Sequence, residues 1–413
     1  MIQSVPCLSV NPQLARNCVS LFLALNCLAT AVASELSEGV QLHGFASQGV
    51  VLNTQNQFAG STPGGAGFDA RELGVNMSWQ AKPDWLVSGQ LMSRWAGPMD
   101  NGALRVDYAF VDHLLLGNEQ RNLGVRVGKV KNPYGFFNMT RDVAHTRAGI
   151  TLPQSIYQDQ IRNFFLAAPG VSLYGNEEYS ADLVSWQVSV LQPEVNSPHI
   201  TAYVVDRQAG HFKGRTSMLA QALWEQDGGK WRAGLSLGQF GIHFNPAPTD
   251  FFGMGSFAGA GDITLNTGVV SLEHNREEWS YTAEYASTRQ LRNGFNVPFM
   301  AILDKDTTIE AYYLQSLWRF APRWQALARY DAVYLDKQDR SGTVFAAATG
   351  LPAAQRYARD VTVGLRYEPA HDWSLFAEWH HVNGGAWLSK LENTPASLKD
   401  SWDMLLLQAA WHF

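Results

Sequence analysis

The segment 275–288, which reads NREEWSYTAEYAST, carries the pattern that decides the fold. Four polar residues lead into Trp279, and from there apolar and polar side chains alternate with a period of two. One row contains Trp279, Tyr281, Ala283 and Tyr285, and the other contains Ser280, Thr282, Glu284, Ala286 and Thr288. Successive side chains of a β-strand point to opposite faces. The segment therefore predicts a polar turn followed by a strand with one apolar face.

The same unit recurs along the chain. The segments 72–81, 324–332 and 361–368 alternate in the same way. Short polar turns are expected at 82–84, 117–122, 175–178, 226–230, 275–278, 321–323 and 369–372. Longer stretches rich in Gly, Asn and Pro lie between the predicted hairpins. This alternation of short and long connections is typical of membrane β-barrels, which have short periplasmic turns and long external loops.

Seven short turns, with both chain ends on the same side, predict eight hairpins. We therefore expect an all-β fold, an antiparallel up-and-down transmembrane barrel of sixteen strands that occupies residues 34–413. The weakest segment is 192–216, where 200–205 reads either as an added pair of strands or as an extended loop. Eighteen strands are the alternative.

The placement of charged and aromatic residues predicts that the apolar rows face lipid. The four rows contain no Asp, Glu, Lys or Arg, and one Lys or Arg facing lipid at mid-bilayer costs roughly 2–4 kcal/mol. A soluble barrel would also exclude charge from its core, but it has no reason to place an aromatic residue after six of the seven turns. We expect an aromatic girdle at the membrane boundary, made of Trp85, Tyr179, Trp231, Trp279, Trp324 and Trp373.

The N-terminal segment has the features of an export signal. Arg16 precedes an apolar core at 19–32, and Ala31-Val32-Ala33 offers a cleavage site. We expect residues 1–33 to be a signal peptide; a membrane anchor is the alternative. Cys7, Cys18 and Cys27 all lie in this segment, so the mature chain has no thiol, which suits an oxidising periplasm. No metal or cofactor is expected.

The bulk composition excludes two classes of protein. A mean hydropathy of −0.17 is too polar for a bundle of membrane helices. A net charge of −6 without a long basic run speaks against nucleic acid as a partner. The expected partners are outer-membrane lipid and lipopolysaccharide, and the expected localisation is a bacterial outer membrane.

The last residues continue the alternating pattern to the end of the chain. Leu405, Leu407, Ala409, Trp411 and Phe413 form one apolar row. A terminal Phe on such a strand resembles the assembly signal of bacterial outer-membrane barrels. We therefore assign Trp411 and Phe413 to that signal, with the barrel-assembly machinery as the partner that pairs with the open strand edge.

Charged residues on the polar rows are expected to line the pore. They are Arg94, Arg105, Asp107, Arg126, Arg232, Arg329, Asp331 and Arg366. Arg94, Arg105 and Arg126 fall on three successive predicted strands, so they are expected to form one positive wall. Such a wall would favour anions. Alternatively, these arginines are ordinary solvated lumen residues.

The connection 132–169 is the third long loop, and it begins with NPYGFF. A loop this apolar is expected to fold into the barrel and narrow it. The run 125–135, VRVGKVKNPYG, resembles that of phosphate-selective-type porins and related members of the Gram-negative porin superfamily, whose third loop folds inward. The resemblance implies a pore that can be trimeric. The expected constriction residues are Asn132, Pro133, Tyr134, Gly135, Arg141, Asp142, Arg147, Asp159 and Arg162.

These features predict a porin, a passive channel for small hydrophilic solutes, and not an enzyme. The Lys-rich ladder of a dedicated phosphate channel is not evident, and no H-E-x-x-H, P-loop or EF-hand pattern occurs. A receptor or adhesin that acts through external loops is the main rival. A barrel-embedded hydrolase is a third reading.

Overall fold

The computed structural model describes residues 39–61, 63–205, 209–250, 259–295 and 306–413. The predicted signal peptide 1–33 and the first residues of the predicted barrel domain, 34–38, lie outside the described residues.

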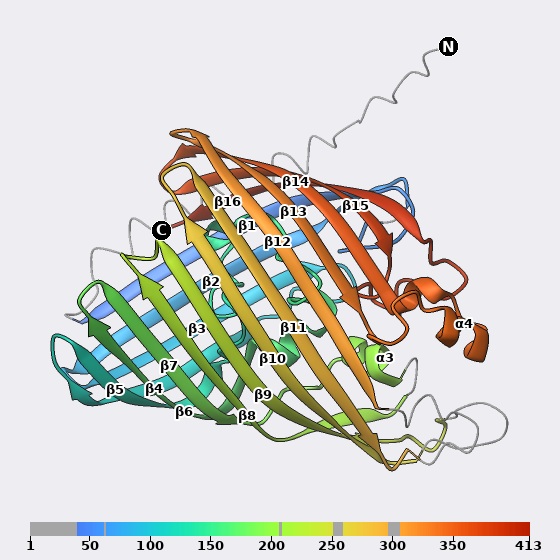
Figure 1. The fold of residues 1–413 in the computed structure, drawn as a ribbon, viewed down its shortest axis with the longest axis horizontal. Helices are drawn as coiled ribbons and strands as arrows, with labels where there is room; N and C mark the ends of the chain where they lie inside the picture. The colour runs from blue at the N-terminus through green and yellow to red at the C-terminus, as the bar shows by residue number, and fades with distance from the viewer. Residues whose placement is uncertain (1–38, 62, 206–208, 251–258, 296–305) are drawn as a thin grey trace.

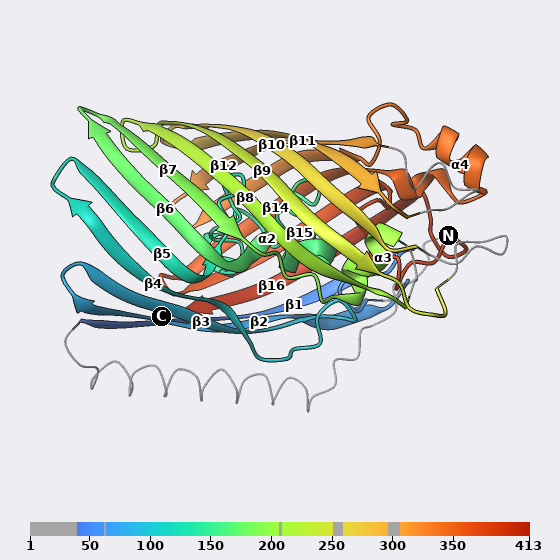
Figure 2. The ribbon, with the colours of Figure 1, turned by 90° about the horizontal axis from the view of Figure 1, so that it is seen from below.

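Sixteen antiparallel strands form a closed barrel (Figures 1 and 2). Each strand pairs with its neighbours in sequence, and β1 pairs with β16, with Phe45 opposite His412. The predicted number of sixteen is confirmed, and the alternative of eighteen is wrong. The strands are β1 (Val40–Asn53), β2 (Ala66–Lys82), β3 (Trp85–Ala96), β4 (Arg105–Gly117), β5 (Arg121–Lys131), β6 (Ala167–Tyr179), β7 (Asp182–Leu191), β8 (His211–Gln226), β9 (Trp231–Asn245), β10 (Gly261–Asn275), β11 (Trp279–Asn293), β12 (Thr307–Ala321), β13 (Trp324–Tyr334), β14 (Tyr357–Ala370), β15 (Trp373–Gly384) and β16 (Ser401–His412).

The seven short turns lie at one end of the barrel and the long loops at the other, where α3 (Pro198–Val205) and α4 (Thr343–Thr349) are seen in Figure 1. Six turns fall where the sequence predicts them. The expected turn at 175–178 is wrong: these residues pair with β5 and β7, and Tyr179 is the last residue of β6. The chain reverses at 180–181, where Ser180 has φ 58°. The polar residues 175–178 extend the hairpin and do not form the turn.

The apolar rows face outward. In β9, Leu235 and Leu237 are 45% and 53% exposed, whereas Ser236 between them is 2% exposed. The same alternation exposes the apolar row of β14, which includes Val361 and Val363. A continuous apolar outer surface of this extent is stable only in contact with lipid.

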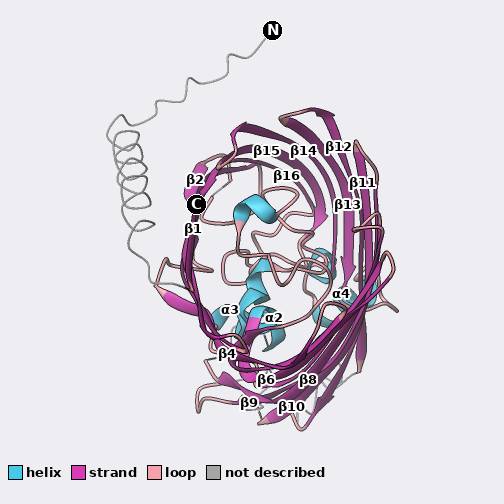
Figure 3. Cartoon of the chain, turned by 90° about the vertical axis from the view of Figure 1, so that its left-hand side faces the viewer, coloured by secondary structure: helices cyan, strands magenta, loops and turns pink. Residues whose placement is uncertain are grey.

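The interior is crossed by loop segments, as seen from the turn end in Figure 3. Loop three, defined here as residues 132–166, contains η1 (Ala144–Thr146), η2 (Asp159–Ile161) and α2 (Arg162–Leu166). It ends three residues earlier than expected, because 167–169 already pair with β5. The connection between β13 and β14 carries α4 and η3 (Ala353–Arg356). No helix among the described residues has the length and apolar character needed to cross a membrane.

The segment 192–205 forms no added strand pair: it lies in the long connection between β7 and β8, and 211–216 belong to β8. It contains the short helix α3, whose His199 donates from Nε2 to the carbonyl of Pro98 (2.9 Å), while its Nδ1 is hydrogen-bonded to Ser389 Oγ (2.7 Å). Ile200 and Val205 are buried. The added strand pair at 200–205 is therefore wrong: within this loop, burial of the apolar side chains against other loops favours a helix over a strand without a partner.

Candidate functional site

The candidate site is the constriction that loop three builds inside the barrel. The two ends of the loop are tied together where it leaves and rejoins the wall. Asn138 Nδ2 donates to the carbonyls of Asn132 (2.9 Å) and Phe165 (2.7 Å). Gly135 has φ 58°, and a side chain there would meet the Tyr157 hydroxyl. Glycine at this position lets the chain turn into the lumen.

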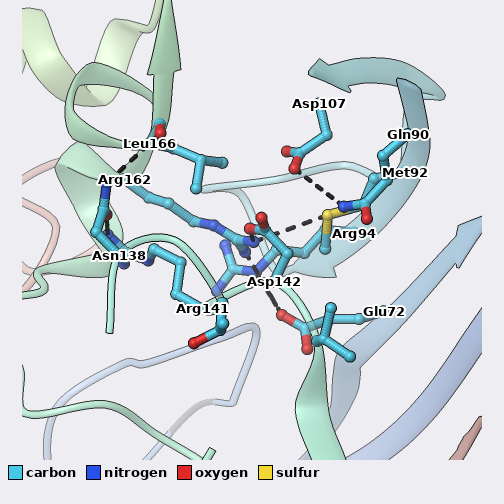
Figure 4. A network of polar contacts seen from close by, with 12 residues as sticks. Glu72, Gln90, Met92, Arg94, Asp107, Asn138, Arg141, Asp142, Arg162 and Leu166 are labelled. Carbon is cyan, nitrogen blue, oxygen red and sulfur yellow. Dashed lines mark hydrogen bonds and ion pairs between the residues drawn. The ribbon is translucent and has the colours of Figure 1, made fainter. Parts of the chain in front are cut away.

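One side of loop three is bound to the wall of β2–β5 by ion pairs (Figure 4). Glu72 on β2 is the centre of this cluster. Its carboxylate accepts from Arg94 on β3 (3.3 Å) and from Arg147 (2.5 Å) and Arg162 (3.5 Å) of the loop. All four side chains are buried, so the pairs are poorly screened by solvent.

Two further carboxylates of the cluster come from the loop itself. Asp142 pairs with Arg162 and with Lys131 at the end of β5, the latter at 2.7 Å. Asp159 pairs with Arg94 (3.2 Å) and Arg141 (3.3 Å). Together with Glu72, these three carboxylates pair with five cations.

The ion pairs decide the charge states of the loop. Burial alone would raise the pKa of Asp142, but Lys131 and Arg162 hold that pKa well below its usual value. Arg94 and Arg141 likewise lower the pKa of Asp159 against the effect of burial. Burial and the adjacent Arg162 lower the pKa of Arg141 to about 10. At neutral pH all these groups are charged.

On the opposite wall, Glu284 of β11 holds the loop through hydrogen bonds. It accepts from the backbone amide of Phe136 (2.9 Å) and from the hydroxyls of Tyr157 (2.6 Å) and Tyr313 (2.8 Å). On β9, Ser236 Oγ accepts from the amide of Gly135 at 3.1 Å. The beginning of loop three is therefore fixed to β9 and β11.

The middle of the loop is bonded to β13–β15. Glu378 accepts from the amides of Ile150 (2.7 Å) and Thr151 (3.2 Å). Arg329 donates to the carbonyl of Thr151 (3.0 Å), and Arg366 donates to that of His145 (3.1 Å). Loop three is thus attached on several sides of the lumen, which places it inside the barrel as predicted.

The eight predicted pore-lining residues all lie on strands, but their arginines do not form an unpaired positive wall. Arg94, Arg105 and Arg126 lie on β3, β4 and β5 as expected. Arg105 pairs with Asp100 at 2.6 Å and Arg126 with Asp112 at 2.8 Å. The remaining contacts are Arg232 with Glu225 and Glu273, Arg366 with Glu368, Asp107 with Gln90 and Lys131, and Asp331 opposite Asp360 in the sheet. Arg329 donates hydrogen bonds to Thr151 and Thr362.

The nine predicted constriction residues all lie in loop three, and Asn132, Pro133 and Tyr134 are buried with the rest of its entry. Glu72, Glu284 and Glu378 lie on polar rows that the sequence predicts to face the lumen, but their role in anchoring loop three is not predicted. Each is an isolated carboxylate within the polar row of a strand, and that position is the signal that could have identified the role. The partners to which hydrogen bonds join them in loop three are 75 to 228 residues away in sequence.

The residues of the predicted aromatic girdle lie at the turn end. Four of the Trp residues stack on a neighbouring strand, with ring centroids 4.1 Å apart for Trp85 and His113 and 5.3 Å apart for Trp279 and Trp318. The other two pairs are Trp231 with His274 and Trp324 with Tyr367. Tyr179 ends β6, and Trp373 begins β15.

The chain end closes the barrel at the same end. Phe413 exchanges two backbone hydrogen bonds with Gly44 of β1 (3.0 and 3.2 Å). Trp411 Nε1 donates to Asp372 (3.0 Å), and its ring lies 5.2 Å from that of Phe413. Both predicted assembly residues are therefore part of the seam between β16 and β1.

Comparison with known proteins supports the architecture at the level of the fold. No family model and no curated protein matches the chain. Among solved structures, it is similar to the outer membrane channel DcaP of Acinetobacter baumannii, with TM-score 0.58, 13% identity, and coverage of 91% of this chain and 97% of that one. The anion-selective porin from Comamonas acidovorans has TM-score 0.52 at 12% identity, covering 91% and 99%. The trimer form of OmpT, an outer membrane protein of Vibrio cholerae, has TM-score 0.51 at 11% identity, covering 91% and 99%.

The fold is therefore that of the sixteen-stranded porin barrels. A closed barrel with a lipid-facing outer surface belongs to a bacterial outer membrane, and this confirms the predicted localisation. The likeness is to porin barrels in general and does not distinguish the phosphate-selective type.

Proposed function

We propose that this protein is an outer-membrane porin, a passive channel for small hydrophilic solutes. The observation that carries the proposal is the polar constriction that loop three forms inside a barrel with an apolar outside. On the turn side of the constriction, lumen groups such as Arg126, Arg232 and Glu225 keep part of their surface open to solvent. A solute entering there would exchange hydration water for these groups.

The sequence allows either a preference for anions or ordinary solvated lumen arginines, and the pairing of the arginines supports only a weak preference. Arg126 illustrates the reason, because its guanidinium is bound to Asp112 and lies over the ring of Tyr174 at 4.0 Å. Each pair acts on passing ions as a dipole rather than as a net charge. For the same reason we propose no selectivity for phosphate.

Planar-bilayer recording of the purified protein tests the proposal. We expect stepwise, ohmic conductance, and a Cl⁻ to K⁺ permeability ratio within about twofold of one. A folded protein that enters the bilayer without raising its conductance would contradict the channel. Heat-denatured protein is the control.

Two matched variants separate selectivity from conductance. Arg126→Gln removes a cation and leaves Asp112 charged, so the reversal potential in a salt gradient should shift towards cation preference. Asp112→Asn should shift it the opposite way by a similar amount. Shifts of the same sign in both variants would contradict the paired arrangement.

We also propose that residues 1–33 are removed on export and that three copies assemble in the membrane alongside lipopolysaccharide. The leader composition supports the first point. The trimer form of the similar Vibrio cholerae protein supports the second. N-terminal sequencing of the mature protein and native electrophoresis of unheated samples test the two statements separately.

A further inference from the structure

A groove crosses the outer surface of the barrel over β9–β14. Its lining includes small side chains on three neighbouring strands, Ala283 on β11, Ser316 on β12 and Ala328 on β13, and these leave a hollow. Larger side chains of the outward-facing rows surround the hollow, namely Leu272, Tyr281, Leu314, Tyr330, Val361 and Val363. Leu314 is 62% exposed. The groove therefore opens to lipid and not to the lumen.

The groove leads towards the end of the barrel that carries the long loops. Tyr330 of β13 and Val361 of β14 lie opposite each other in the sheet and line the groove on that side. Arg359 is exposed on the same face of β14, two residues nearer the loops. This spacing places it about 7 Å from Val361 along the strand. An acyl chain in the groove would thus have its polar end beside a guanidinium group.

Three cations gather at this end of the groove. Lys337 (3.2 Å) and Arg340 both pair with Glu310, which lies on the outward-facing row of β12. Arg340 and Arg359 both lie over the ring of Tyr334, 5.2 and 5.7 Å from its centroid. The shared carboxylate and the shared ring therefore bring Lys337, Arg340 and Arg359 together into one cationic cluster.

The cationic cluster carries more positive charge than its carboxylate balances. Glu310 is divided between two cations, whose side chains remain 49% and 50% exposed. Arg359 has no carboxylate partner among the described residues, and its Nε donates to Tyr334 Oη (3.2 Å). The nearby carboxylates of Asp336 and Asp339 are buried and accept from backbone amides of their own connection. The cluster is thus left with an excess of two positive charges over Glu310.

Other outward-facing cations at the loop end are balanced singly. Arg215 on β8 pairs with Asp262 (3.2 Å), and Lys129 on β5 pairs with Glu194 (2.7 Å). Neither residue is part of the groove. The cationic cluster therefore differs from these pairs both in its excess charge and in its position at the end of an apolar hollow.

We propose that the groove and the cationic cluster bind a phosphorylated glycolipid of the outer leaflet, the lipid A portion of lipopolysaccharide. An acyl chain lies over Ala283, Ser316 and Ala328, and phosphate oxygens accept charge-assisted hydrogen bonds from Arg340 and Arg359. The long loops mark the external side of such barrels, where this lipid is found. The inference gives a site for the proposed contact with lipopolysaccharide, and it rests on the barrel's place in the outer membrane and not on conduction.

The excess of two positive charges favours a headgroup with two phosphates. Diphosphoryl and monophosphoryl lipid A are matched probes, because they share the sugar and the acyl chains and differ in one phosphate. Phosphatidylglycerol is the single-phosphate lipid without the sugar. Native mass spectrometry measures the binding of each lipid to the full-length mature protein, refolded from urea into an uncharged detergent. We expect diphosphoryl lipid A to bind at least about fivefold more tightly than either other lipid.

A matched pair of double variants tests the cationic cluster. Arg340→Gln with Arg359→Gln should weaken the binding of diphosphoryl lipid A at least about tenfold and reduce its advantage over the monophosphoryl form to about twofold or less. Lys129→Gln with Arg215→Gln removes the same charge at the same end of the barrel and should change binding by less than about twofold. Heat-modifiable migration verifies that each variant is folded.

A second matched pair tests the groove. Ala328→Phe fills the hollow, and Ala109→Phe adds the same ring to an exposed position on β4 outside it. The first variant should weaken the binding of both forms of lipid A by a similar factor, about fivefold, because the acyl chain loses its contacts. The second should leave binding unchanged.

Equal binding of the two forms of lipid A to the wild-type protein would overturn the inference. So would equally tight binding of phosphatidylglycerol, or equal losses in the two double variants. Bilayer recording on the same samples separates this from the proposed function. A conducting channel without preference for diphosphoryl lipid A leaves the porin standing and removes the lipid site. The preference without conductance removes the porin and leaves the site.

Discussion

The two walls that face each other across the lumen hold the same loop by different forces. The wall of β2–β5 contributes Glu72 and Arg94, which form directional ion pairs with Arg147, Arg162 and Asp159. The wall of β9–β12 contributes apolar side chains that pack against the far end of the loop, and Glu284 adds hydrogen bonds at its beginning. The difference indicates that the wall of β2–β5, the charged wall, sets the position of the loop. The wall of β9–β12, the apolar wall, packs against the loop and leaves a cavity beside it.

The largest expected loss in the free energy of unfolding comes from a substitution at the charged wall. Arg162→Met removes the cation between Glu72 and Asp142 and leaves two buried carboxylates with fewer partners. Breaking a buried pair in this way costs about 3–5 kcal/mol. The free energy of unfolding by urea, followed by Trp fluorescence of protein folded into phospholipid vesicles, measures it.

The matched control is Arg121→Met, because the pair of Arg121 with Glu177 is exposed at the turn end. Exposed pairs contribute about 0–1 kcal/mol. Equal losses in the two variants would mean that the buried cluster does not hold the loop.

Acid should weaken the contacts of loop three with the charged wall before it weakens the contacts with the apolar wall. The pKa values of Asp142 and Asp159 are lowered in the fold, so their ionised forms contribute stability that is fully present above the ordinary Asp pKa, about 3.9. That stability is lost as pH falls through the lowered values. We expect the protection of the amides around Asp142 and Asp159, measured relative to the unfolded chain at each pH, to stay constant from pH 7 to pH 4 and to fall below pH 4. Protection that is already lost near pH 6 at these amides would contradict this assignment.

A smaller effect is expected from the apolar wall. Phe240 is fully buried, and its ring lies 5.2 Å from that of Phe164 and 5.3 Å from that of Phe165. Phe240→Leu keeps the apolar character and loses part of the volume, at a cost of about 1–2 kcal/mol. Because the contacts are apolar, the loss should be the same at low and high salt. A loss of stability that depends on ionic strength would contradict the prediction that apolar contacts hold the loop at this wall.

The smallest effect is expected outside the lumen. Trp279 and Trp318 stack at the turn end, and both face outward. Trp279→Ala removes an aromatic pair worth about 0.5–1.5 kcal/mol and should leave conductance unchanged. Urea unfolding and bilayer recording on one sample check both halves of this prediction. A changed conductance would show that the lipid side and the lumen are coupled.

The fold was predictable because it depends on a local pattern. Period-two alternation and short polar turns locate strands such as β11 without knowledge of their partners. The error at 175–178 has the same origin, since polarity at the end of a hairpin looks like a turn whether the chain reverses there or continues. At 200–205 the local pattern was ambiguous, and contacts with other loops decided for α3.

The candidate site was predictable only in part. The apolar composition of loop three indicated that it folds inward, and this holds. Which wall residue binds which loop residue could not be predicted, because pairs such as Glu72 with Arg147 join distant parts of the chain. The neutralisation of the arginines follows from such pairs. A count of charges on polar rows therefore overstates the positive field.

The span of loop three across the closing strands has a mechanical consequence. Glu72 lies on β2 and Glu378 on β15, on either side of the junction between β1 and β16, and the short run from Arg147 to Thr151 is bound to both. The ring of His145 also lies 3.7 Å from that of His412 on the last strand. The loop thus acts as an internal brace that resists sideways opening of the cylinder at the place where its two ends meet.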